Sequence, residues 1–202
     1  MRAHRVALCL VASSFATIAS CSSHDDITPK QLVKLMYLDN NKELSFQRSD
    51  TKVGEYGRAD ILDQDSIDVS LSYMKGSAYK SDTPPHSANE ISTGVNGSYS
   101  YCVTGLNRNL SGNQELAQLA IPSINHLIVS LLHPDVSTLD SYKEHLDESS
   151  SLLQSIIQDK NGAVSGKGYD GSDETYYING GWLWRWSSND NFVMLCAYPV
   201  ID

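Results

Sequence analysis

The spacing of apolar residues changes twice along this chain, and this change constrains its fold more than any other feature. Apolar and polar residues alternate over 67–73 and 99–103, apolar residues recur every three or four positions over 113–160, and alternation returns after residue 176. Alternation indicates strands with one buried face, and the longer period indicates helices. The chain therefore predicts an α+β fold with an antiparallel sheet packed against a helical hairpin.

The helical region is predicted to form two helices. Pro122 interrupts the first apolar stripe and is expected to kink or split that helix, because proline lacks the backbone donor. A turn at residues 133–135 leads into a second helix over about 137–160. An N-terminal helix over about 29–40 is also expected, since Thr28 and Gln31 flank Pro29 with the spacing of a capping box.

Two further segments are informative about the sheet. Residues 192–200 are apolar at both odd and even positions, which predicts a strand in the middle of the sheet. Residues 75–96 are rich in Ser, Pro and Gly and are predicted to form a long loop.

The first 21 residues have the pattern of an export signal. Arg2 and Arg5 precede an apolar run over residues 6–19, and small residues lead to Cys21. The run is shorter than the ~20 apolar residues that span a bilayer, which disfavours a transmembrane helix. We expect a signal peptide over residues 1–20.

The cleavage region Ile18-Ala19-Ser20-Cys21 resembles the lipobox of bacterial lipoproteins. The resemblance implies that Cys21 is acylated, that residues 21–27 form a tether to the lipid bilayer, and that residues 28–202 form one domain. Ser22 after the cysteine implies, by the same resemblance, the outer membrane of a Gram-negative envelope. A plain secretory signal with a free Cys21 is the alternative.

The charge of the chain restricts its partners. Removing residues 1–20 leaves 13 basic and 24 acidic residues, a net charge of −11. Binding to nucleic acid or to anionic lipid needs Lys and Arg, so neither partner is expected. The acidity favours a cationic protein partner, or simply keeps the domain soluble.

Two of the four cysteines are candidates for a disulfide. Cys9 lies in the signal peptide and Cys21 is the expected acylation site, which leaves Cys102 and Cys196. In an oxidising compartment two such thiols favour one disulfide, and two separate buried thiols are the alternative. No His or Cys lies at ligand spacing from either, so no metal site is expected there.

The three tryptophans occupy alternate positions of one short predicted strand, so Trp182, Trp184 and Trp186 project from the same face. Such a row is either part of the core or an exposed binding platform. Because Arg185 and Ser187 on the opposite face look solvent-facing, the core interpretation is favoured. Tyr169, Tyr176 and Tyr177 are close in sequence and keep the binding interpretation open.

Two acidic clusters and two histidines contain residue types that bind metal ions. The aspartates at 60, 63, 65 and 68 lack the glycine and glutamate of a calcium-binding EF-hand loop, and both they and the acids of 170–174 are expected to be solvated loop charges. His126 and His133 are seven positions apart on one helix, too far to share a metal without other partners. We expect a packed His126 and a His133 at a helix end.

Catalytic motifs are weak. Ser77-Ala78-Tyr79-Lys80 matches the Ser-x-x-Lys signature and Ser123-Ile124-Asn125 loosely follows the second motif of penicillin-binding enzymes, but no Lys-Thr-Gly follows. We therefore expect no catalytic residues and no cofactor, and a non-catalytic protein-binding envelope lipoprotein, either an inhibitor or an immunity protein against an envelope-directed enzyme. A glycan- or small-ligand-binding module using the tryptophan row is the alternative, and a hydrolase whose site is assembled only by folding is a third.

Overall fold

The computed structural model describes residues 27–36, 44–51, 54–63, 67–107, 113–158 and 162–201. The predicted signal peptide and Cys21 lie outside these residues. So do the predicted tether up to residue 26, Asp65, and the segment 159–161.

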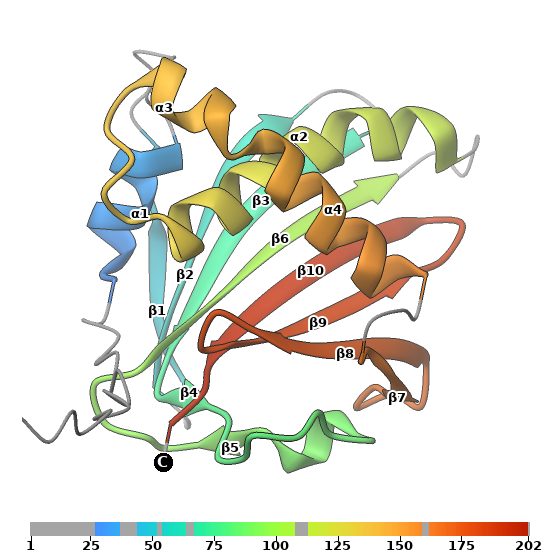
Figure 1. The fold of residues 1–202 in the computed structure, drawn as a ribbon. Helices are drawn as coiled ribbons and strands as arrows, with labels where there is room; N and C mark the ends of the chain where they lie inside the picture. Colours follow the sequence, from blue (N-terminus) through green and yellow to red (C-terminus); the bar gives the residue numbers. More distant parts are fainter. Residues whose placement is uncertain are drawn as a thin grey trace, which may run out of the picture.

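The elements follow one another in this order: α1 (Pro29–Met36), β1 (Gln47–Thr51), β2 (Gly54–Asp63), β3 (Ile67–Lys75), β4 (Ser77–Ala78), the 3-10 helix η1 (Ala88–Glu90), β5 (Ser92–Thr93), β6 (Tyr99–Asn107), α2 (Asn113–Leu132), α3 (Leu139–Glu144), α4 (Leu146–Ile157), β7 (Val164–Lys167), β8 (Asp173–Asn179), β9 (Trp182–Ser188) and β10 (Phe192–Pro199). Eight strands form one antiparallel sheet in the order β1-β2-β3-β6-β10-β9-β8-β7 (Figure 1). The α+β prediction is confirmed, and β10 lies in the middle of the sheet as expected.

The helices cover one face of the sheet (Figure 1). The helix α2 packs on β3, β6 and β10, and α4 packs on α2, β8 and β9. Between them lies the main core, whose fully buried side chains include Leu71, Val103, Leu127, Ile128 and Trp184. At the start of α1, Gln31 Oε1 accepts a hydrogen bond from the Thr28 amide at 2.9 Å, which confirms the predicted cap. Among the described residues, no helix combines the length and apolar character that crossing a bilayer requires.

Pro122 lies inside α2, which continues through it as one helix, so of the two expected outcomes the split does not occur. The helical region differs from the prediction in one respect. The predicted second helix over about 137–160 is instead two helices, α3 and α4. They meet at His145, whose φ of −101° and ψ of 0° are not helical, so the helical hydrogen-bond pattern is interrupted there.

Three strands of the sheet, β1, β2 and β7, were not predicted. On β2 the core side is formed partly by small residues, Gly57 and Ala59, both buried, so the alternating apolar signal is weak. The Tyr73 ring fills this space: a Cβ atom at Gly57 would lie only 2.1 Å from its Cε1. At this position the large side chain that fills the core between the two strands therefore comes from β3.

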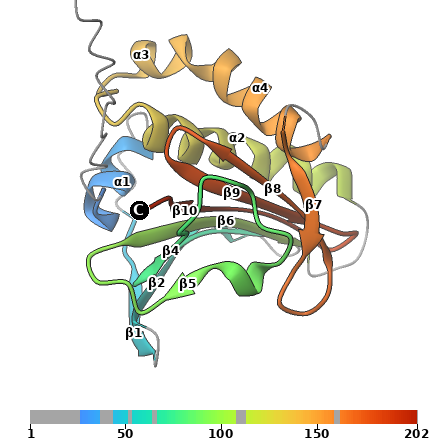
Figure 2. The ribbon, with the colours of Figure 1, turned by 60° about the horizontal axis from the view of Figure 1, so that its bottom comes forward.

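The segment predicted as a loop over 75–96 packs on the other face of the sheet, and we call residues 76–98 the strap. Figure 2 shows it on the side of the sheet opposite the helices, with β4 and β5 paired inside it. Backbone hydrogen bonds fix one end, from the Tyr79 amide to the Pro199 carbonyl at 2.9 Å and from the Ile201 amide to the Tyr79 carbonyl at 2.8 Å. The sheet is therefore covered on both faces.

Candidate functional site

The tryptophan row lies on the helix-covered face. Trp182, Trp184 and Trp186 are all buried in the main core, and Trp184 Nε1 donates to the Asn179 carbonyl at 3.1 Å. The core interpretation of the row is the one that the structure shows, and the three indoles present no exposed face to a ligand. Tyr177 packs against the same core, whereas Tyr176 projects to the strap-covered face and is fully buried.

The opposite face of β9 is not solvent-facing, which corrects the prediction for Arg185 and Ser187. Both are buried, and the Arg185 side chain is only 10% exposed. Its Nε and Nη2 each lie 2.5 Å from an oxygen of Glu174 on β8, whose side chain is 1% exposed. Glu174 is therefore not a solvated charge of an acidic turn, because a second layer of protein covers it and Arg185 neutralises it.

Tyrosines surround this buried ion pair. The Tyr176 hydroxyl donates to Glu174 Oε2 at 2.6 Å, Arg185 Nη1 donates to the Tyr198 hydroxyl at 3.4 Å, and the Tyr169 ring lies over the guanidinium at 5.3 Å. Burial raises the pKa of Tyr198, an effect that Arg185 partly offsets. Burial by itself lowers the pKa of Arg185, but the hydrogen bonds with Glu174 and Tyr198 outweigh it and leave that pKa above its ordinary value. Arg185 thus stays charged at any physiological pH, and its contacts orient the rings around it.

The predicted disulfide is confirmed and lies on the same face. Cys102 on β6 and Cys196 on β10 stand directly opposite each other in the register of the two central strands, with their Cα atoms 4.0 Å apart. Both contribute to the smaller core beneath the strap, together with Tyr79, Leu183 and Tyr198. The disulfide therefore joins the two central strands, β6 and β10, on the face of the sheet that the strap covers.

A pocket of about 290 Å³ lies between this face and the strap, and we call it the tyrosine pocket. Ser77, Ile91 and Thr93 of the strap form one wall, and Tyr169 contributes from the turn before β8. Its remaining walls are made by Tyr56, Ser72, Tyr73, Met74, Ser100, Cys102 and Tyr198. The described residues that line it include no acid, base or imidazole, so the walls offer aromatic faces, a thioether and hydroxyl groups. Such walls can contact the apolar surface of a ligand and form hydrogen bonds with its polar groups.

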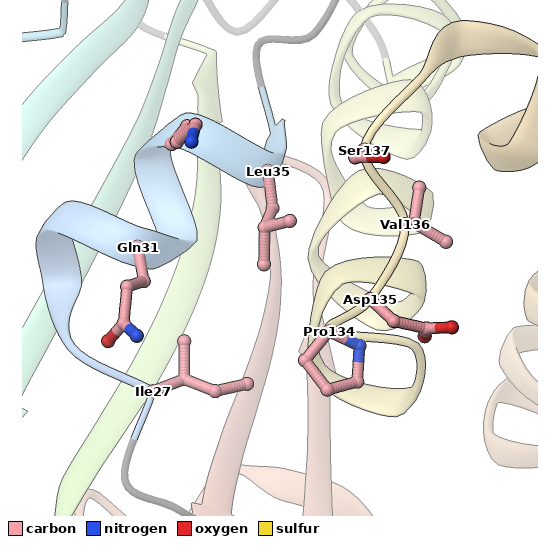
Figure 3. A pocket seen from close by; sticks show the side chains of 8 residues that line it. Ile27, Gln31, Leu35, Pro134, Asp135, Val136 and Ser137 are labelled. Carbon is pink, nitrogen blue, oxygen red and sulfur yellow. The ribbon is translucent and has the colours of Figure 1, made fainter.

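A second hollow, of about 340 Å³, lies between α1 and the turn that follows α2 (Figure 3). Ile27 and Leu35 of the α1 side face Pro134 across it, and Lys34 and Asp135 supply charges at its border. One short helix and one turn form this hollow, whereas sheet strands and a disulfide hold the tyrosine pocket. Because rigid elements position binding groups more accurately, the tyrosine pocket is the stronger candidate.

The first acidic cluster also differs from the prediction, because Asp60 and Asp68 lie on strands rather than in a loop. Arg58 bridges them, with Nε 3.2 Å from Asp60 Oδ1 and Nη2 2.5 Å from Asp68 Oδ2. The Asp68 side chain is 3% exposed, so it is a buried partner of Arg58 and not a solvated charge. Asp63 ends β2, and Asp65 lies outside the described residues.

The two serine motifs are not brought together. Ser77 is a buried residue of β4 and lines the tyrosine pocket, whereas Ser123 belongs to α2 on the helix-covered face. The sheet separates the two elements (Figure 2).

Sequence reasoning missed one cluster in the helical layer. His133, just after α2, meets His145 and Glu148 at the start of α4, and the two imidazoles stack with centroids 3.6 Å apart. The only sequence signal was the three-residue spacing of His145 and Glu148, because His133 comes from another helix. His126 is not part of this cluster; it stacks on Tyr142 at 4.1 Å, as expected of a packed histidine.

Comparisons of the chain with protein families, with curated proteins and with solved structures find no match. The fold and the site define a disulfide-linked α+β domain with a tyrosine-lined pocket on one face of its sheet.

Proposed function

We propose that this protein is a membrane-anchored, non-catalytic binding module of the bacterial cell envelope. In this proposal acylated Cys21 holds it at the bilayer, and the tyrosine pocket receives a side chain of a cationic protein. An inhibitor or immunity protein against an envelope-directed enzyme would have these properties. The observation that carries the proposal is Tyr169, a large ring that is 59% exposed at the border of the pocket.

Export is supported by the leader sequence and by the disulfide. Disulfides form and persist outside the reducing cytoplasm, and the pair Cys102–Cys196 bridges two central strands. Together with the lipobox at residues 18–21, this favours a domain that folds in an oxidising compartment close to a membrane.

Binding to a protein is supported by the composition of the pocket. Tyrosine is enriched at the energetic centres of protein interfaces, because its ring gives a large apolar contact and its hydroxyl gives a hydrogen bond. The rings of Tyr56, Tyr169 and Tyr198 converge on one pocket, and the buried Arg185 beneath Tyr169 holds that ring in place. A partner's side chain that enters the pocket would meet a preformed surface.

A cationic partner is favoured by charge. The expected mature chain carries a net charge of −11, and opposite charge speeds encounter and makes association sensitive to salt. The lifetime of the complex would then depend on contacts in the pocket, and the association rate would depend on the charge.

The binding proposal is tested by affinity capture from native envelopes with the full acylated protein in detergent, at low and high salt. Tyr169→Ser should abolish capture of the main partner. Ile157→Ser is the matched control, because Ile157 is also an exposed large apolar residue but lies on α4. Capture that is equal for the wild type and Tyr169→Ser, or that does not weaken with salt, would contradict the proposal.

The anchor is tested separately. Intact-mass measurement of the purified protein should show loss of residues 1–20 and added acyl mass on Cys21, and Cys21→Ser should release the domain from the membrane fraction. An unprocessed amino terminus would contradict the envelope assignment.

A glycan- or small-ligand-binding role is the alternative for the same pocket, and its volume favours this role. A cavity of about 290 Å³ is close to the lower end of the volumes that hold small ligands. Calorimetric titration with peptidoglycan fragments distinguishes the two roles, because a ligand-binding module gives saturable heat without any protein partner.

A further inference from the structure

Three metal-ligating side chains converge on the outer side of the helical layer. His133 Nε2 lies 3.0 Å from Glu148 Oε2, and His145 Nδ1 lies 3.6 Å from the same oxygen. One atom from each of the three residues can be chosen so that all lie within 4.8 Å of one another. The side chains are 24%, 31% and 59% exposed for His133, His145 and Glu148, so solvent reaches the cluster.

These separations are close to those of a tetrahedral zinc site. With Zn–N and Zn–O bonds of about 2.0–2.2 Å, ligand atoms around the ion lie about 3.3–3.5 Å apart. The two measured separations, 3.0 and 3.6 Å, lie on either side of that range. The two imidazoles stack with their planes 15° apart. Because a metal ion lies close to the plane of each imidazole that binds it, at least one ring must turn out of this stack before all three donors point to one ion.

The backbone leaves these side chains free for such a role. His145 occupies the N-cap position of α4, yet its side chain makes no capping hydrogen bond and is directed to Glu148 in the first turn. His133 follows the last residue of α2, and its amide donates to the Val129 carbonyl at 2.8 Å. The helix ends therefore hold the three residues in place without using their donor atoms as caps.

We infer that His133, His145 and Glu148 form a binding site for a divalent transition-metal ion, with Zn²⁺ the best match. Two imidazoles and one carboxylate suit zinc and its neighbours in the first transition row, whereas Mg²⁺ and Ca²⁺ prefer oxygen donors. Three protein ligands leave a fourth position, which water or a group from another molecule would occupy.

The site would connect parts of the helical layer that are distant in sequence. An ion there joins the end of α2 to the junction of α3 and α4. Because the three donors converge only in the folded chain, the ion would stabilise the native state by mass action. This site is independent of the tyrosine pocket, which lies on the other face of the sheet.

The test is calorimetric titration of Zn²⁺ into the full protein, purified in detergent without a polyhistidine tag and stripped with a chelator. We expect one zinc ion to bind per chain. His133→Ala and His145→Ala should each weaken binding by about 100-fold or more, since even loss of an outer hydrogen-bonding partner costs 10–100-fold. His86→Ala is the matched control: His86 is exposed on the strap, and its loss should leave the affinity unchanged.

Two further measurements guard against variants that misfold. Glu148→Gln keeps the size of the side chain and should weaken Zn²⁺ binding while circular dichroism stays unchanged. Co²⁺ in the wild type should show the visible absorption of a four-coordinate site, which the histidine variants should lose. Absence of Zn²⁺ binding, or affinity equal in the wild type and both histidine variants, would overturn the inference and identify the cluster as a hydrogen-bonded structural group.

Discussion

The two faces of the central sheet are built from the same strands but by different chemistry. On the helix-covered face, Trp184, Leu195 and Val103 pack against α2 and α4 in an apolar core. On the strap-covered face, alternate residues of the same strands include the ion pair Glu174–Arg185 and the disulfide. Two continuous helices exclude water from the first face, whereas a strap with little regular structure covers the second and leaves a pocket beneath it.

The residues that stabilise the fold and those that line the candidate binding site lie on different faces of the sheet. An apolar core tolerates no cavity without a cost, so the helix-covered face is the structural face. Polar groups beneath a strap must be paired to be buried, and each pairing fixes side-chain geometry that a binding site can use.

The largest effect is expected on the helix-covered face. Trp184→Ala should lower the free energy of unfolding by about 4–5 kcal/mol, because it leaves a large cavity in the core and also removes the hydrogen bond from Trp184 Nε1 to Asn179. Chemical denaturation measures this loss. Ile157→Ala, at a residue 41% exposed on α4, is the control and should change stability by less than about 0.5 kcal/mol.

On the strap-covered face, Glu174→Ala should cost about 3–4 kcal/mol, because it leaves the buried Arg185 without its counter-charge. Asp173→Ala, at the neighbouring exposed position of β8, should leave stability nearly unchanged. The double variant Glu174→Leu, Arg185→Met should be more stable than Glu174→Ala, since no unpaired charge remains. If the double variant is as unstable as Glu174→Ala, the pair stabilises the fold by more than charge neutralisation.

Removing the disulfide should have a smaller effect. The variant with Cys102→Ala and Cys196→Ala should lose about 2–3 kcal/mol in denaturation experiments, from greater freedom of the unfolded chain. Native hydrogen bonding between β6 and β10 should persist, because their register extends over six residue pairs. The free energy of unfolding of the wild type should fall by the same amount under reducing conditions. Equal stability of the oxidised and reduced forms would contradict the prediction.

The last effect needs no substitution and is expected only at alkaline pH. Burial and the hydrogen bond with Glu55 raise the pKa of Tyr73 from 10.0 to about 12, and burial raises that of Tyr142 to about 12. The protonated form is favoured by folding, so this stabilisation is complete below pH 10 and is lost as pH rises toward 12. Absorbance titration should show a late-ionising group of tyrosines that coincides with unfolding. Ionisation of every tyrosine near pH 10, with the fold intact, would contradict it.

The elements with strong periodicity could be predicted from the sequence. The strand 67–73, the helical region and the fully apolar β10 all have patterns that burial enforces along their whole length. Strand β2 could not be predicted, because its core side carries Gly57 and Ala59 and the packing volume comes from Tyr73 on β3.

The candidate site was less accessible to prediction. Alternation correctly assigned the tryptophan row to one face, but it could not show that Arg185 on the other face is buried, with the Tyr169 ring over its guanidinium. A polar residue in a strand is solvated on an open face and paired on a covered one, and the alternation pattern alone does not show which layer lies above. The cluster of His133, His145 and Glu148 was missed for a related reason, because the break at His145 between α3 and α4 brings it to His133.

The β-bridge between Tyr79 and Val200 sets a limit on the order of folding during synthesis. Residues 199–201 lie at and just beyond the end of β10, the last of the described strands along the chain, yet they hold the strap that is synthesised more than a hundred positions earlier. Cys196 belongs to the same late segment. Oxidation of the cysteines and seating of the strap must therefore both wait until this segment has emerged, so a chain interrupted before β10 would carry neither.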